Sequence, residues 1–130
     1  MTTVHVFAGG GVRGIGSLVL AEKLAFQPDM ICGTSTGSII AAARSIGYSY
    51  SEIKHLYLEH VKTIFKPNYV GFGGMFAPKY KAKNLEKVIR FIFSNKTNKD
   101  CEKSLMINAY NLSLNKPKYW KSWDNEEWLL

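Results

Sequence analysis

Hydrophobic positions in the first half of the chain alternate between two kinds of pattern. Short apolar runs at residues 4–8 and 30–32 each end in glycine, which is typical of buried strands. Residues 14–26 instead repeat apolar side chains at close to helical spacing, and so does the run at 39–46 that Gly47 closes. The order strand, helix, strand, helix predicts a right-handed β-α-β unit that feeds a mostly parallel sheet, and hence an α/β fold.

Beyond Gly47 the pattern predicts two more helices with a long loop between them. Residues 51–65 carry an apolar face, and Ser51 is the expected N-cap. Residues 66–82 are rich in glycine and proline, which indicates an irregular loop of the length that lids and binding loops have. Its apolar side chains, either a lipid-facing lid or a cover for the core, are Tyr69, Phe72, Met75 and Phe76. A further helix is expected from Asn84 to about Phe93.

The end of the sequence has the pattern of a β-hairpin. Apolar and aromatic runs at 105–110 and 118–123 flank a turn at 115–117, which contains proline. Residues 126–130 are expected to begin a last helix. The hairpin therefore extends the predicted sheet with an antiparallel strand.

A first glycine-rich motif, Gly9-Gly10-Gly11-Val12-Arg13-Gly14, comes directly after the first predicted strand. Its spacing fits the dinucleotide-binding pattern G-x-G-x-x-G, which also lies between a strand and a helix. The acid that binds the ribose should end the second strand, but Asp29 comes before that strand. A dinucleotide site is therefore an alternative that the placement disfavours, and a simple tight turn is another.

A second motif, Gly33-Thr34-Ser35-Thr36-Gly37, matches the pattern G-x-S-x-G. It lies between an apolar strand and a predicted helix, the setting of a nucleophile elbow. Small neighbours permit the sharp turn, and the helix N-terminus favours negative charge that develops there. We therefore expect Ser35 to be a nucleophile, with Gly33 and Gly37 as the structural glycines of the elbow.

Together the two motifs resemble the patatin-like phospholipase family, whose pattern is a G-G-G-x-[RK]-G oxyanion loop followed by a G-x-S-x-G elbow. The resemblance covers essentially the whole chain and implies a three-layer α/β/α core, cut short on its C-terminal side. It implies a lipid acyl hydrolase in which the loop from Gly9 to Gly14 stabilises the oxyanion through Gly10 and Gly11. Arg13 would brace this loop or meet a lipid phosphate, unless it is simply a surface cation at a helix start.

The family's Ser-Asp dyad takes its aspartate from a D-G-[GA] motif, and no Asp-Gly pair occurs in this sequence. The acids and histidines to weigh are Asp29, Asp100, Asp124, His5, His55 and His60. Asp29 lies at the wrong end of the elbow strand, and Asp124 is the least implausible substitute. An inactive lipid-binding or interaction module that keeps the fold but lacks the base is therefore an open alternative, as is a fragment of a longer hydrolase.

Length, net charge and the absence of special segments indicate the domain count, the expected partners and the expected location of the protein. The 130 residues suit one domain, here an incomplete patatin-like domain spanning 1–130, and the formal net charge is +7. This charge favours anionic partners, of which we expect a phospholipid or other acyl-lipid substrate rather than nucleic acid. No signal peptide is evident, so we expect a cytoplasmic protein with peripheral membrane contact. No metal-ligand spacing is present and no cofactor is expected, whereas an uncovered sheet edge would favour oligomers.

Overall fold

The computed structural model describes residues 1–66 and 82–130, and shows a four-stranded sheet of order β1-β2-β3-β4. Strands β1 (Val4–Phe7), β2 (Met30–Thr34) and β3 (Ser104–Asn111) are parallel. Strand β4 (Lys116–Lys121) returns antiparallel to β3. The predicted α/β architecture with a mostly parallel sheet and flanking helices is therefore confirmed. The predicted loop at 66–82, with its four apolar side chains, lies almost wholly outside the described residues.

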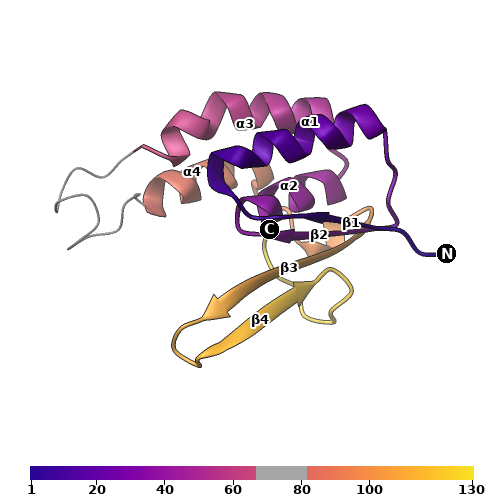
Figure 1. Cartoon of the computed structure of the whole chain (residues 1–130). Helices are drawn as coiled ribbons and strands as arrows, with labels where there is room; N and C mark the ends of the chain where they lie inside the picture. Colours follow the sequence, from indigo (N-terminus) through magenta and orange to yellow (C-terminus); the bar gives the residue numbers. More distant parts are fainter. Residues whose placement is uncertain (67–81) are drawn as a thin grey trace.

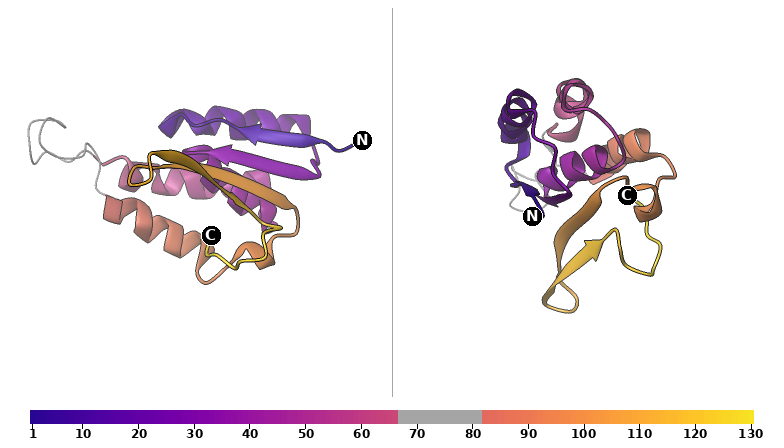
Figure 2. Two further views of the ribbon diagram at one scale, coloured as in Figure 1. Left: turned by 90° about the horizontal axis from the view of Figure 1, so that it is seen from below. Right: turned by 90° about the vertical axis from the view of Figure 1, so that its right-hand side faces the viewer.

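The helices of the described part of the chain lie on one face of this sheet (Figures 1 and 2). They are α1 (Gly14–Leu24), α2 (Thr36–Ser45), α3 (Tyr50–Ile64) and α4 (Ala82–Phe93), with short 3-10 turns η1 (Gly11–Arg13) and η3 (Asn98–Asp100). Helix α2 packs directly on β1, β2 and β3, and α1 and α3 pack against each other. Helix α2 is thus the element that connects the strand ends to the helical layer.

The hydrophobic core lies between α2 and the inner face of the sheet. Phe7, Ile31 and Leu105 come from three adjacent strands and meet Ile40 of α2, and each is at most 1% exposed. Alanines at 41–43 allow the helix to approach the sheet closely. Burial of such side chains stabilises the fold by about 1.5–3 kcal/mol each. The core therefore fixes the position of α2, and with it the turn that precedes the helix.

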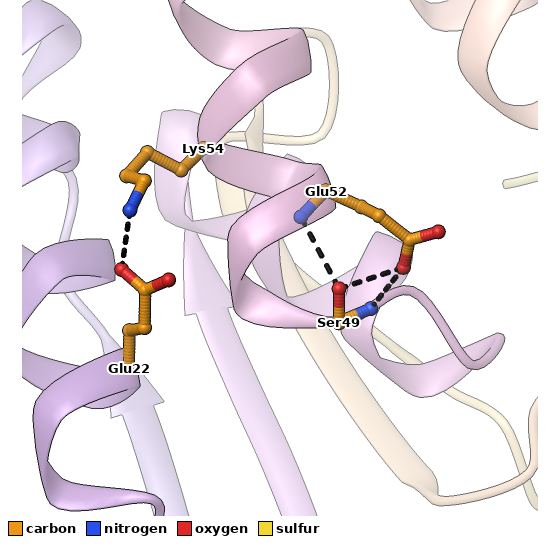
Figure 3. A network of polar contacts seen from close by, with 4 residues as sticks. All are labelled: Glu22, Ser49, Glu52 and Lys54. Carbon is orange, nitrogen blue, oxygen red and sulfur yellow. Dashed lines mark hydrogen bonds and ion pairs between the residues drawn. The ribbon is translucent and has the colours of Figure 1, made fainter.

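Helix α3 begins at Tyr50, one residue earlier than expected, and its cap lies two residues earlier. Its N-cap is Ser49, whose hydroxyl accepts a hydrogen bond from the Glu52 amide at 3.2 Å, so the prediction of Ser51 was wrong. The Glu52 carboxylate in turn accepts from the Ser49 amide at 2.8 Å, which completes a capping box (Figure 3). Asn84 was likewise wrong as a cap, because α4 already begins at Ala82.

A lysine–glutamate pair joins the two outer helices. The Lys54 ammonium of α3 lies 2.5 Å from the Glu22 carboxylate of α1, and both side chains are about one-third exposed (Figure 3). Partly solvated pairs of this kind contribute at most about 1 kcal/mol. The pair orients α3 beside α1 and adds little to the stability of the fold.

The end of the chain contains no helix, so the prediction for 126–130 was wrong. Leu129 instead forms an isolated antiparallel bridge with Thr97, and the Leu130 amide donates to the Lys96 carbonyl at 3.0 Å. The buried Asn98 side chain accepts from the Trp128 amide and donates to the Glu126 carbonyl. Long-range pairing therefore determines the conformation of this segment. Among residues 1–66 and 82–130, no helix is long and apolar enough to cross a membrane.

Candidate active site

Ser35 occupies a strained turn between the end of β2 and the start of α2. Its backbone has φ 56° and ψ −126°, a conformation that residues other than glycine rarely adopt. Such strain costs on the order of 1–3 kcal/mol and tends to occur at functional sites. The Ser35 side chain is exposed and makes no capping hydrogen bond to α2. Its hydroxyl is therefore presented to solvent at the N-terminus of a helix, as in a nucleophile elbow.

The glycines on either side of Ser35 are sterically required. A Cβ atom added to Gly33 would lie 2.7 Å from the Cα of Ser38, and one added to Gly37 would lie 2.7 Å from the carbonyl carbon of Phe7. The Ser38 hydroxyl also donates to the Gly33 carbonyl at 2.9 Å, across the base of the turn. Only glycine at both positions lets the helix start this close to the two strand ends.

The first glycine-rich motif lies beside this turn. Strands β1 and β2 are parallel with Phe7 opposite Gly33, so both motifs leave the sheet at the same edge. A Cβ atom on Gly9 would lie 3.0 Å from the Cβ and 3.8 Å from the Oγ of Ser35. The structure therefore brings the segment from Gly9 to Gly14 and the serine together.

Helix α3 supports the glycine loop from behind, through a residue that the sequence analysis did not single out. The Tyr57 hydroxyl donates a hydrogen bond to the carbonyl oxygen of Gly11, which has φ 57°. The same hydroxyl lies against Gly14, where an added Cβ would be 3.0 Å away. Burial raises the pKa of Tyr57, so the phenol remains a neutral donor at physiological pH. Periodicity identified Tyr57 only as part of an apolar face, because its partner is 46 residues away.

Two further residues of the predicted oxyanion loop lie on its solvent-exposed side. Gly10 and Arg13 are exposed, and the Arg13 amide donates to the Gly10 carbonyl at 3.1 Å to close the turn η1. Arg13 then forms the N-terminal boundary of α1. The guanidinium is therefore accessible at the same edge of the sheet as Ser35.

The three aspartates weighed as bases are engaged elsewhere. The Asp29 carboxylate accepts from the Thr3 amide at 2.7 Å and the Thr3 hydroxyl at 2.8 Å, beside the start of β2. These hydrogen bonds lower the pKa of Asp29. Asp100 accepts from the Thr97 amide in a second capping box. Asp124 accepts from the Lys121 amide at 3.1 Å, and Lys121 pairs with Met106 rather than with the end of β3 near the elbow.

The three histidines weighed as alternative bases lie in three different environments. His5 stacks on Phe7 with ring centroids 4.2 Å apart, and its burial lowers its pKa. His55 is exposed on α3. His60 packs edge-on to Phe91 and lines a small apolar cavity of about 20 Å³, whose wall also includes Thr36 of the elbow. Its buried Nε2 atom has no hydrogen-bond partner among the described residues.

The end of β2 also bears on the dinucleotide alternative. A ribose-binding acid should lie there, but the position holds Thr34, whose hydroxyl donates to the Asn108 carboxamide at 2.7 Å. The strand end is therefore closed by a neutral pair of side chains. The acid that the dinucleotide motif requires at this position is therefore replaced by a threonine.

Comparison with known proteins shows which family this chain belongs to. The family model described as patatin-like phospholipase matches residues 5–128. The chain belongs to the patatin-like phospholipase family. Its predicted membership of this family is thereby confirmed.

Several patatin-like relatives match most of this chain. A cGAMP-activated phospholipase of Escherichia coli (strain TW11681) is 29% identical over 92% of the chain, and a cUMP-AMP-activated phospholipase of Escherichia coli is 30% identical over 87%. Patatin-like protein 1 of Oryza sativa subsp. indica is 26% identical over 94%. The chain spans only 39%, 35% and 36% of these three relatives. The patatin-like segment described here therefore corresponds to less than half of each.

Proposed function

We propose that Ser35 is the nucleophile of a lipid acyl hydrolase of the phospholipase A or esterase type. The observation that carries this proposal is the strained backbone of Ser35 between β2 and α2, with Gly9 packed against its side chain. A serine is held at φ 56° together with ψ −126° only where the surrounding contacts require it. Family membership supports a lipid substrate, for which we propose a carboxylic ester.

In the proposed reaction, the Ser35 Oγ atom attacks the carbonyl carbon of the ester. The alcohol portion leaves with a proton, and an acyl-serine remains. Water then attacks the acyl carbon, which releases the fatty acid and restores the serine hydroxyl. The backbone amides of Gly10 and Gly11 would donate to the oxyanion in both steps, and such donors typically contribute about 10²–10³-fold to the rate.

Three features support the glycine loop in this role. It leaves the sheet at the same edge as the serine, it contacts the serine side chain through Gly9, and Tyr57 fixes the carbonyl of Gly11. The Gly11 carbonyl shares one rigid peptide plane with the Val12 amide, so this hydrogen bond fixes that plane and restrains the loop to which the Gly10 and Gly11 amides belong. Arg13 is exposed beside the loop and would meet the lipid phosphate.

An activated serine also needs a proton acceptor. The described aspartates are held by backbone amides away from the elbow, which keeps the inactive lipid-binding module as the second candidate. A fluorophosphonate probe distinguishes the two candidates. We expect labelling of the wild-type chain that is lost in Ser35→Ala and retained in Ser51→Ala, which changes an exposed serine on α3. Absence of labelling in the wild type would contradict the hydrolase proposal for this chain.

A further inference from the structure

The β3–β4 hairpin extends beyond the strand end that carries Ser35. Thr34, the last residue of β2, lies opposite Asn108, and β3 continues from there to Asn111 before the chain turns back. At about 3.3 Å per residue, the turn lies about 10 Å further along the strand direction. The right-hand view of Figure 2 shows the hairpin projecting away from the helical layer. Its tip therefore protrudes on the same edge of the sheet as the candidate active site.

The tip presents apolar side chains to solvent. Leu112 and Leu114 in the turn are 86% and 62% exposed, and Tyr110 and Tyr119 on the adjoining strands are 54% and 52% exposed. An isolated exposed leucine needs no explanation, but two on one protruding turn with two tyrosines behind them form a patch. This hairpin tip, defined as Tyr110 to Tyr119, has its most apolar residues furthest from the body of the protein.

Side-chain hydrogen bonds hold the turn in this shape. The Asn111 carboxamide accepts from the Leu114 amide at 3.0 Å, and the Tyr110 hydroxyl donates to the Asn115 carboxamide at 2.8 Å. Asn115 itself takes φ 49°, a conformation that asparagine tolerates better than most residues. The exposed leucines are thus presented by an ordered turn, and binding through them orders little additional chain.

The charge of the hairpin has one sign. Residues 104–121 contain Lys116, Lys118 and Lys121 and no aspartate or glutamate. The Lys118 ammonium lies 5.0 Å from the centre of the Trp120 ring, which holds one charge beside an aromatic face. Behind the leucines, tyrosines and lysines alternate along the two strands, since Lys116 lies opposite Asn111, Lys118 opposite Ala109 and Tyr119 opposite Asn108. Apolar side chains at the tip with aromatic and basic side chains behind them suit the interface of an anionic bilayer.

We propose that the hairpin tip is a docking surface for an anionic phospholipid bilayer. The leucines would enter the acyl boundary, while the lysines would remain among the anionic head groups. A nucleic acid would also attract the lysines and aromatic rings, but it offers no apolar phase for Leu112 and Leu114. Docking of the tip would turn the Ser35 edge toward the lipid. Only this consequence for orientation rests on the proposed function, because binding itself does not require hydrolysis.

Vesicle co-sedimentation tests the proposal directly. We expect the chain to bind phosphatidylcholine vesicles that contain phosphatidylglycerol, with weaker binding at high salt and to phosphatidylcholine alone. The double change Leu112→Ser and Leu114→Ser should weaken binding about tenfold or more. Lys116→Gln with Lys118→Gln should weaken it about 30-fold.

A matched pair of leucines elsewhere provides the control. Leu20 and Leu24 of α1 are 58% and 66% exposed, yet they lie on the helical layer away from the hairpin. Leu20→Ser with Leu24→Ser should leave vesicle binding unchanged. Circular dichroism of every variant confirms that a loss of binding is not a loss of fold. Ser35→Ala should bind vesicles like the wild type, so that failure of the proposed chemistry and failure of docking give different results.

Three outcomes would overturn the proposal. The first is no binding of the wild type to either kind of vesicle. The second is an equal loss of binding from the α1 pair and the hairpin pair, which would indicate nonspecific hydrophobic adsorption. The third is binding of a single-stranded oligonucleotide that the hairpin changes abolish while vesicle binding is retained, which would assign the tip to nucleic acid.

Discussion

The hydroxyl of Tyr57 on α3 donates a hydrogen bond to the backbone carbonyl of Gly11 in the loop beside Ser35. This bond connects the outer helical layer to the loop that is proposed to hold the oxyanion. A side chain 22 residues beyond the serine in sequence thereby supports the conformation of its neighbouring loop. We therefore infer that Tyr57 positions this loop.

Tyr57→Phe tests this positioning role. The variant keeps the ring in the core but loses the donor, so the Gly11 carbonyl is freed and the loop loosens. We expect amide hydrogen exchange at residues 9–14 to become faster, whether or not the chain is catalytically active. The maximal rate at which a fluorophosphonate labels Ser35 should fall about tenfold, whereas the affinity for the probe should change little.

Tyr48→Phe is the matched control for Tyr57→Phe. The Tyr48 hydroxyl also donates to a backbone carbonyl, that of Ile92 at 3.4 Å, but it lies away from the elbow. Both changes should lower the free energy of unfolding by about 1 kcal/mol. Equal effects of the two changes on exchange in the glycine loop would show that Tyr57 has no special role there.

Gly37→Ala should damage the elbow itself. The added methyl group would lie 2.7 Å from the Phe7 carbonyl carbon and 2.9 Å from the Ala8 carbonyl oxygen, so the helix must move away from β1. We expect a loss of at least about 3 kcal/mol in the free energy of unfolding, measured by urea denaturation. Gly16→Ala is the control, because no atom lies within 4 Å of the added group on α1. That change should raise stability by about 0.5–1 kcal/mol, and destabilisation by both changes would contradict the steric argument.

Ser49→Ala should destabilise α3 by removing its capping box. The Glu52 amide loses its acceptor, and we expect a decrease of about 1 kcal/mol in the free energy of unfolding. Ser51→Ala changes the second residue of the same helix, two positions after the cap, and should alter stability by less than about 0.5 kcal/mol. Thermal denaturation followed by circular dichroism measures both changes, and the reverse order of effects would restore Ser51 as the cap.

Asp29 should contribute to the pH dependence of stability. Hydrogen bonds from Thr3 lower the pKa of its carboxyl in the folded chain below the value in the unfolded chain. Its contribution is therefore fully present above the unfolded pKa of about 3.9 and is lost as the pH falls through the lower folded pKa. NMR titration of the Asp29 carboxyl should give this low pKa. In Asp29→Asn, the free energy of unfolding should depend less steeply on pH at acidic pH. An unchanged pH dependence would contradict a lowered pKa for Asp29.

The parts of the site that follow from local chemistry could be predicted from the sequence. The glycines around Ser35 and the apolar runs before them determined the strand, the turn and the helix, since each choice depends on neighbours a few residues away. The cap at Ser49 also had a local signal, because Glu52 follows it by three residues in the pattern of a capping box.

The features that were not predicted correctly from the sequence depend on contacts between segments that are distant in the chain. Tyr57 meets Gly11 only after α3 packs beside α1, and helical periodicity does not distinguish a core tyrosine from one that holds a loop. The last residues pair with Thr97 and Asn98, and this pairing overrides their local preference for helix. Tertiary context, which one sequence does not display, decided both.

The approach of Gly37 to the Phe7 carbonyl has a consequence for how the site forms. These residues are 30 positions apart, and they meet only when β1 has paired with β2 across the α1 crossover. A peptide that carries the elbow alone would relax from the strained conformation of Ser35, because nothing would oppose the relaxation. The strained geometry of Ser35 therefore depends on the assembled sheet, and the conformation of this one residue reports whether β1 and β2 have paired.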